Sequence, residues 1–194
     1  MKQNKVAITG GIGSGKSTVS SILREMGYVV FDCDEISRQV ACSVEVLEKI
    51  KKEFGSEFVV GNQLQRKKLA EFVFADAQRT KRLNEIMHPP VISELKRRLE
   101  ECGEKIVFAE VPLLFETGMD KMFDNIWIVV ADENERINRV QKRDSLDEKS
   151  IKDRIKNQTD YEKSQFSAHT IIKNDGDLKK LAQTVRQAAE MLNG

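Results

Sequence analysis

The segment Gly10-Gly-Ile-Gly-Ser-Gly-Lys-Ser-Thr18 joins a short apolar run, Val6 to Thr9, to a stretch with helical spacing. It satisfies the pattern G-x-x-x-x-G-K-[ST], in which glycines let the backbone approach phosphate oxygens and turn its N–H groups toward them. The N-terminus of the following helix adds partial positive charge at the same point. The segment therefore predicts a phosphate-binding loop (P-loop); the alternative is a chance match in a glycine-rich turn.

Two side chains of this loop have tasks of their own. Lys16 is expected to reach the β- and γ-phosphates of a nucleotide, and the hydroxyl of Ser17 to complete the coordination of Mg²⁺. The backbone of the other positions would enclose the phosphates. The predicted nucleotide-binding set is Gly11, Ile12, Gly13, Ser14, Gly15, Lys16, Ser17 and Thr18.

Apolar segments of two kinds alternate along the rest of the chain. Short runs rich in β-branched residues predict buried strands, and longer stretches with a 3.6-residue period predict helices between them. The expected strands are Val6 to Thr9, Tyr28 to Phe31, Ile106 to Ala109, Ile126 to Val130 and Thr170 to Ile172. Because parallel neighbours need crossover connections, the pattern predicts an α/β fold: a three-layer sandwich around a mostly parallel five-stranded sheet.

We expect a single domain, 1–194, that carries a helical insertion and a helical lid. Residues 34–102 show helical periodicity, punctuated by a Gly61-Asn62 turn signal and by Pro89-Pro90 but by no flexible linker. Residues 134–161 form a second helical pair, the expected lid. The remaining segments, expected to form the nucleotide-binding core, are 1–33, 103–133 and 162–194.

Composition excludes several classes of protein. The 194 residues contain 32 Lys and Arg against 31 Asp and Glu, so the net charge of +1 offers no bulk attraction for nucleic acid or an anionic membrane. Three scattered cysteines provide neither a disulfide framework nor a CxxC-type zinc site. No apolar stretch suggests a signal or a membrane span. We expect a cytosolic protein, a monomer or weak homo-oligomer, without nucleic-acid or membrane partners.

A P-loop alone does not identify the group that accepts the phosphoryl. A switch GTPase would carry an Asn-Lys-x-Asp guanine motif and a transporter ATPase a Leu-Ser-Gly-Gly signature, and neither occurs in the sequence. With one P-loop in 194 residues, a small-molecule kinase is favoured. The alternatives are a kinase for another acceptor and an ATP-switched regulatory protein.

Two carboxylates, Asp32 and Asp34, follow the second expected strand. They would point the same way if the strand continued, at the strand end where ligands bind in open α/β sheets. A kinase needs a carboxylate to orient and deprotonate an acceptor hydroxyl. The alternative is structural: Asp34 caps a helix that starts at Glu35, and Asp32 is a solvated strand end.

Arginines recur on one face of the expected lid helix. Arg136, Arg139 and Arg143 are three and four residues apart, a spacing that suits phosphate binding. A solvated basic face paired with Glu133 and Glu135 explains the same spacing equally well.

Two further features carry little information by themselves. His88 stands before two prolines, where it either contacts an acceptor or caps a helix end. Glu110 ends the third expected strand and is a candidate for the second shell of a metal, although the segment lacks a convincing Walker B motif.

Taken together, the motifs resemble those of the dephospho-CoA kinase family over nearly the whole chain. No single short motif carries the resemblance; it rests on Thr9 to Thr18, Asp32-Cys-Asp34, Phe54-Gly55, Leu64-Gln-Arg66, His88-Pro89, Pro112-Leu-Leu-Phe-Glu116, Arg139 to Asp144, Gln158 and Asn174-Asp-Gly176. The resemblance implies a nucleoside-monophosphate-kinase-like fold. It also implies transfer of the γ-phosphoryl of ATP, with Mg²⁺, to the ribose 3′-hydroxyl of dephospho-CoA, the last step of coenzyme A synthesis.

The resemblance further implies roles for individual residues. Catalysis would fall to Asp34 as general base, with Lys16 and Arg139. The acceptor would contact Asp32, Arg66, His88, Pro112 and Leu113. The phosphates would be embraced by Arg139 and Arg143, and Asn174 would lie near the base of ATP.

The sequence departs from the family pattern at two places. Cys33 stands where alanine is common, and a small apolar residue is expected to leave the chemistry unchanged. Ala168-His169 stands where Ala-Asp is usual, shortly before Asn174.

Overall fold

The computed structural model describes residues 2–144, 147–156, 158 and 170–192. The chain forms two compact units: the first comprises Met1–Phe31 and Cys102–Gly194, and the second Asp32–Glu101. Ala168 and His169, where the sequence departs from the family pattern, lie outside the described residues, as does the expected end of the lid at 161.

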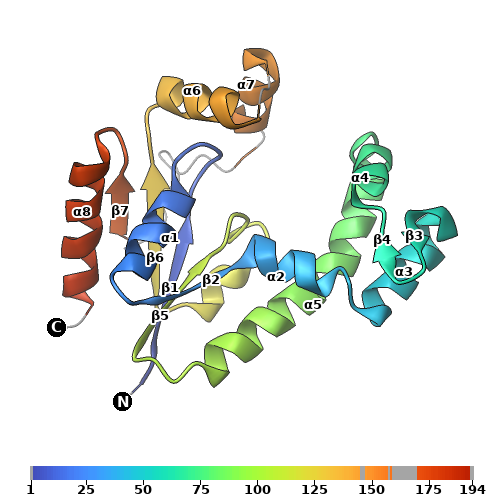
Figure 1. Ribbon diagram of the computed structural model, residues 1–194, viewed down its shortest axis with the longest axis horizontal. Helices are drawn as coiled ribbons and strands as arrows, with labels where there is room; N and C mark the ends of the chain where they lie inside the picture. Colours follow the sequence, from blue (N-terminus) through green and yellow to red (C-terminus); the bar gives the residue numbers. More distant parts are fainter. Residues whose placement is uncertain (1, 145–146, 157, 159–169, 193–194) are drawn as a thin grey trace. The chain divides into compact units, whose positions relative to one another are not determined.

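A parallel sheet forms the centre of the first unit (Figure 1). Among the described residues it contains β1 (Asn4–Thr9), β2 (Val29–Asp32), β5 (Ile106–Glu110), β6 (Asn125–Val130) and β7 (Thr170–Lys173), in the order β2-β5-β1-β6-β7. β1 pairs in parallel with both β5 and β6, and β6 pairs in parallel with β7. The α/β prediction is confirmed, and the chain crosses from one side of β1 to the other, which is where ligands bind in such sheets.

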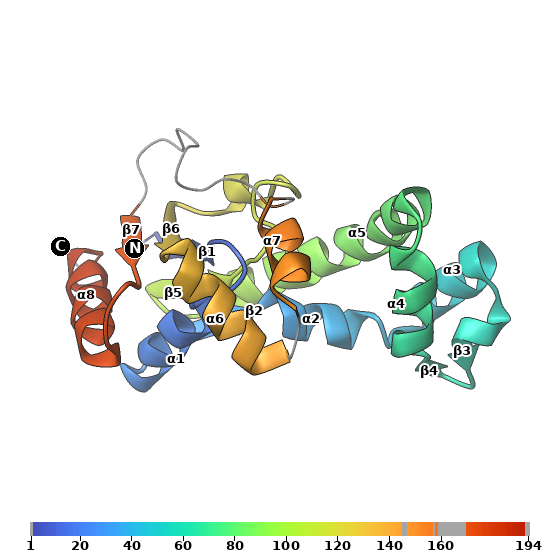
Figure 2. The ribbon, with the colours of Figure 1, turned by 90° about the horizontal axis from the view of Figure 1, so that it is seen from above.

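Helices α1 (Lys16–Glu25) and α8 (Leu178–Met191) pack on each other and cover one face of the sheet (Figure 2). Alternate strand residues, Val6 and Ile8 in β1 and Trp127 and Val129 in β6, form a common core with the apolar faces of these helices. Ala7 and Ile128, which point to the other face, are also buried. Burial on both faces explains why the strands are continuous apolar runs.

The expected lid is a pair of short helices, α6 (Glu133–Asp144) and α7 (Glu148–Lys156), beside the loop that follows β1 (Figures 1 and 2). Ile137, Val140 and Ile151 form a small core of their own. A short 3₁₀ turn, η2 (Met119–Met122), precedes β6.

The second unit is mainly helical, as the periodicity predicted. Its helices are α2 (Cys33–Val40), α3 (Val44–Phe54), α4 (Arg66–Phe74) and α5 (Ala77–Glu101), with a 3₁₀ turn, η1 (Ser56–Phe58). Val46, Leu47 and Ile50 of α3 form its core with residues of η1 and α4.

The turn signals in this unit have different structural outcomes. Gly61-Asn62 forms the turn of a small hairpin, β3 (Val59–Val60) with β4 (Gln63–Leu64), which the helical pattern did not predict. Pro89 and Pro90 lie inside the 25-residue helix α5. His88 therefore caps no helix end, and α5 continues although each proline lacks the N–H that a helix normally uses.

Candidate active site

The P-loop requires glycine for its shape. Gly15 lies at φ +97° and Gly13 at φ +75°, in the left-handed region that side chains with a Cβ disfavour. A Cβ on Gly15 would lie 2.1 Å from Nδ2 of Asn174, and one on Gly13 would lie 2.6 Å from the carbonyl oxygen of Arg136. The loop is therefore closely enclosed by side chains and backbone from later in the chain.

Lys16, the first residue of α1, turns back over this loop. Its Nζ donates hydrogen bonds to the carbonyl oxygens of Gly10, at 2.8 Å, and Gly11, at 3.0 Å. Ser17 is exposed and Thr18 half-buried in the same first turn. The ammonium group is thus held against the start of the loop, just after β1.

Ile12, at the tip of the loop, is held by three separate contacts. Its N–H donates to Oε1 of Gln158 at 2.7 Å, and its carbonyl accepts from Nε of Arg136 at 2.9 Å. Its side chain packs against the core of Ile137, Val140 and Ile151. Arg136 of α6 and Gln158, which follows α7, therefore fix the backbone of the loop tip.

Asn174 and Arg139 support the middle of the loop. The buried amide of Asn174 donates from Nδ2 to the carbonyl of Ser14 at 2.8 Å. Arg139 donates from Nη2 to the carbonyl of Asn174 at 2.9 Å, and its Nη1 lies 3.5 Å from the carbonyls of Gly13 and Ser14. This places one guanidinium charge against the loop.

Ser14 also presents an unsatisfied group. Its buried Oγ finds no hydrogen-bond partner in the described part of the chain. Buried hydroxyls are normally bonded, so a polar ligand in the loop would satisfy it. Together with the glycines and the cations, this fits the loop to a phosphate chain.

Glu110, at the end of β5, is held beside α1, the helix that follows the P-loop. The hydroxyl of Ser20 on α1 donates to its Oε2 at 2.7 Å. In the register of the sheet, Glu110 pairs with Ile8 of β1, one residue before the strand's end. A carboxylate is therefore oriented at the end of the strand next to β1.

The structure corrects the interpretation of the two aspartates. β2 ends at Asp32 and α2 begins at Cys33, so strand geometry does not extend to Asp34. Oδ1 of Asp32 accepts the N–H groups of Asp34, at 2.8 Å, and Glu35, at 3.1 Å. The helix cap is Asp32 rather than Asp34, because the helix starts two residues earlier than expected. Asp34 is left exposed in the first turn of α2.

The other predicted acceptor residues of the second unit are spread over its helices. Arg66, at the start of α4, donates to the carbonyl of Arg38 at 2.6 Å. His88 is half-buried, and burial lowers the pKa of its imidazole below the ordinary 6.5. A hollow of about 580 Å³ lies along α5, lined by Ala77, Thr80, Lys81, Asn84, Glu85, His88 and Pro89.

Arg143, Pro112 and Leu113 are the remaining predicted residues of the first unit. Arg143 forms a paired contact with Asp144, at 2.7 and 2.8 Å, which raises the pKa of its guanidinium. Pro112 is half-buried and Leu113 exposed in the segment after β5. Of the predicted residues outside the P-loop, Arg139 and Asn174 are the ones that the structure shows in contact with it.

Sequence reasoning left two loop contacts out of the candidate site. Arg136 is not among the predicted site residues, although its position one turn before Arg139 indicates the same helix face. Gln158 is named in the sequence analysis only as part of the family resemblance, and no spacing rule links it to Ile12.

A P-loop after the central strand of a parallel sheet, with arginines from a helical pair on the loop, defines a P-loop kinase. The fold agrees: a shikimate kinase from Acinetobacter baumannii superposes with a TM-score of 0.54 over 98% of this chain and 94% of that one, at 18% identity. The sequence model of the family described as dephospho-CoA kinase matches residues 4–180, and the chain belongs to that family.

Relatives support this membership. A dephospho-CoA kinase from Fusobacterium nucleatum is 37% identical over 188 residues, 96% of this chain and 97% of the relative. One from Thermus thermophilus is 36% identical over 97% of this chain and 92% of its own. A solved dephospho-CoA kinase from Campylobacter jejuni is 26% identical, with a TM-score of 0.73 over 98% of both chains.

In the described part of the chain, no helix combines the length and apolarity needed to cross a bilayer.

Proposed function

We propose that this protein is a dephospho-CoA kinase that transfers the γ-phosphoryl of ATP to the 3′-hydroxyl of dephospho-CoA and releases CoA and ADP. The observation that carries the proposal is family membership over residues 4–180, joined to a P-loop that is held by Arg136 of α6 and by Asn174, just after β7. Kinases of this class use ATP.

The residues around the loop fit a triphosphate. We propose that the N–H groups of residues 11–18 and the Oγ of Ser14 bind phosphate oxygens, and that Lys16 exchanges its two carbonyl contacts for the β- and γ-phosphates. Arg139, already against the loop, and Arg143 neutralise charge on the transferred group. Ser17 would hold Mg²⁺, which neutralises phosphate charge when bound.

For the acceptor, we propose that Asp34 receives the proton of the 3′-hydroxyl while that oxygen attacks the γ-phosphorus and the bond to ADP breaks. Its exposed place in the first turn of α2, which the cap from Asp32 orders, supports this role. Arg66, His88, Pro112 and Leu113 are proposed acceptor contacts.

The test is ADP release from Mg-ATP with dephospho-CoA, beside adenosine, a nucleoside monophosphate and no acceptor. Strong stimulation by dephospho-CoA alone supports the proposal. Preference for another acceptor, or hydrolysis independent of acceptor, overturns it.

The role of Asp34 needs its own variants. Asp34→Asn should abolish turnover and leave ATP affinity nearly unchanged. Glu48→Gln, which removes an exposed carboxylate paired with Lys51 on α3, is the matched control and should retain turnover. Retained activity in Asp34→Asn removes that residue as the base.

A further inference from the structure

α2 is a short helix that carries the exposed side chain of Asp34, the proposed general base. It has eight residues, too few to be stable in isolation, so its position depends on contacts outside it. Cys33 and Ile36 are buried, and the cap from Asp32 fixes its first turn. In its last turn the carbonyl of Arg38 accepts a hydrogen bond from Arg66 of α4 at 2.6 Å, and a second contact comes from α5.

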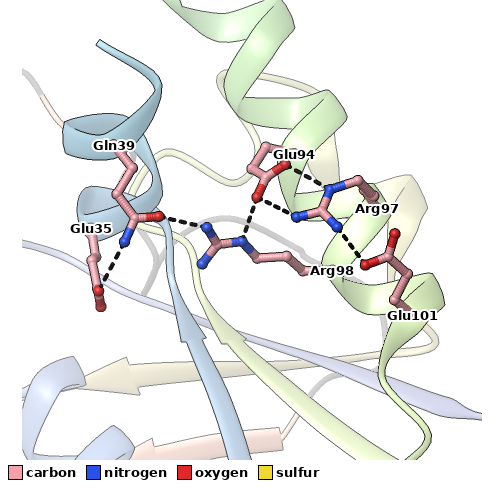
Figure 3. Close-up of polar contacts among 6 residues, drawn as sticks. All are labelled: Glu35, Gln39, Glu94, Arg97, Arg98 and Glu101. Atoms are coloured by element: carbon pink, nitrogen blue, oxygen red, sulfur yellow. Dashed lines mark hydrogen bonds and ion pairs between the residues drawn. The ribbon is translucent and has the colours of Figure 1, made fainter. Parts of the chain in front are cut away.

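A polar network on α5 provides that contact (Figure 3). Arg98 donates from Nη2 to Oε1 of Gln39 at 2.5 Å, and Gln39 donates from Nε2 to Oε1 of Glu35 at 3.2 Å. Arg98 also donates from Nε to Oε1 of Glu94 at 2.7 Å. The guanidinium therefore links the carboxylate of α5 to the amide of α2.

The side chain of Arg98 is less exposed than that of its neighbour Arg97. The side chains of Arg98 and Glu94 are 26% and 23% exposed, whereas that of Arg97 is 53% exposed. Arg97 pairs with Glu94 and Glu101 of its own helix (Figure 3). The two arginines share a carboxylate, but in the described structure the bond to α2 comes from Arg98.

The carboxyl of Glu94 is ionised at neutral pH. Hydrogen bonds from Arg97 and Arg98 lower the pKa of its carboxyl to about 2. The anchor of Arg98 is consequently an ionised group throughout the range in which a kinase would be assayed.

Resting on the proposed function, we propose that Arg98 is a positioning residue for the reaction: through Gln39 it fixes the last turn of α2 and thereby the place of Asp34 in the first. Gln39 is five residues after Asp34, so a shift of one end of this rigid segment moves the other. A general base must be placed within hydrogen-bond distance of its proton, and displacement by about 1 Å costs up to roughly a hundredfold in rate.

The test compares Arg98→Met, which keeps the apolar stem, with the control Arg97→Met. Arg98→Met should lower kcat roughly tenfold and leave KM for ATP unchanged, because the base is displaced and the P-loop is not. Arg97→Met, which also loses bonds to Glu94, should keep wild-type kcat. Arg98→Lys should recover part of the loss, since an ammonium donates to the same acceptors without a planar fork.

A second readout follows α2 directly. Hydrogen exchange of the amides of Ser37 to Val40 should accelerate in Arg98→Met and not in Arg97→Met. If Arg98→Met does not fold, Gln39→Met removes the same link from α2 and should show the same kcat and exchange effects.

The failures are distinguishable. Equal losses in Arg97→Met and Arg98→Met, or a wild-type kcat in Arg98→Met while Asp34→Asn is inactive, overturn the positioning role alone. Activity retained in Asp34→Asn, or no stimulation by dephospho-CoA in the wild type, overturns the proposed function itself.

Discussion

Asn174 donates a hydrogen bond from its side-chain amide to the carbonyl oxygen of Ser14, 160 residues away in the chain, over 2.8 Å. Its own N–H donates to Val130 of β6 at 2.8 Å. The middle of the P-loop is therefore held by a residue that the sheet itself fixes in place, just after the end of β7.

Asn174→Ala should destabilise the fold and weaken ATP binding. Among the described residues, the substitution leaves the Ser14 carbonyl with the 3.5 Å approach of Arg139, and an unsatisfied buried acceptor costs about 1–3 kcal/mol. Urea unfolding and nucleotide titration measure the two effects. Asn174→Asp should be worse, because a carboxylate would face the carbonyl oxygen. Wild-type behaviour in both assays would show that this bond contributes nothing.

Gly15→Ala should abolish ATP binding. The methyl group would be 2.1 Å from Nδ2 of Asn174 at a backbone conformation of φ +97°, so the loop must change shape. The comparison is Gly27→Ala at the end of α1, where φ is +88° but no atom lies within 4 Å of the added Cβ. That control should lose about 1 kcal/mol of stability from strain alone and keep wild-type KM for ATP. Equal ATP affinities in the two variants would contradict the clash of the added methyl group with Asn174.

The fold was largely predictable because its signals are local. Strands buried on both faces form continuous apolar runs in the sequence. Their predicted ends differ from the observed ones by at most two residues, as in β1 (Asn4–Thr9) and β2 (Val29–Asp32). Pro89-Pro90 was expected to interrupt the helical region, but both prolines lie inside α5. A helix that packs along its length tolerates missing N–H donors that an isolated helix does not.

The candidate site was only partly predictable. The P-loop is contiguous, so its pattern was visible, but the contacts of Ile12 with Gln158 and Arg136 join segments more than 120 residues apart. Such contacts depend on tertiary packing, which residue spacing does not encode. The observed cap, Asp32, lies two residues before Asp34, the cap in the structural alternative, because helix boundaries follow competing local hydrogen bonds.

Asp32 should tolerate asparagine better than alanine. Asn keeps a side-chain oxygen for the N–H groups of Asp34 and Glu35, whereas Ala removes it and costs about 1 kcal/mol. Because the cap orders the first turn of α2, Asp32→Ala should also lower kcat more than Asp32→Asn. Thermal unfolding and steady-state kinetics compare the two. Asparagine as damaging to stability as alanine would exclude capping as the main role of Asp32.

Glu94→Gln should reveal a pH-dependent part of the stability. Hydrogen bonds from Arg97 and Arg98 hold the carboxyl pKa at about 2 in the folded protein, below its ordinary 4.5. The unfolded state therefore binds the proton first, so the stabilisation is fully present above pH 4.5 and is lost as the pH falls toward 2. At pH 6 the free energy of unfolding of the wild type should exceed that of the variant by roughly 1 kcal/mol. The difference is small because solvent screens these partly exposed ion pairs.

In urea unfolding at a series of pH values, that difference should shrink as the pH falls below 4.5. The comparison is Asn84→Ala on the exposed surface of α5, which removes no ionisable group, so its difference from wild type should not vary with pH. A Glu94→Gln difference that stayed constant down to pH 2 would mean that the carboxylate charge does not hold the network, and that the Arg98 link to α2 must draw its rigidity from packing instead.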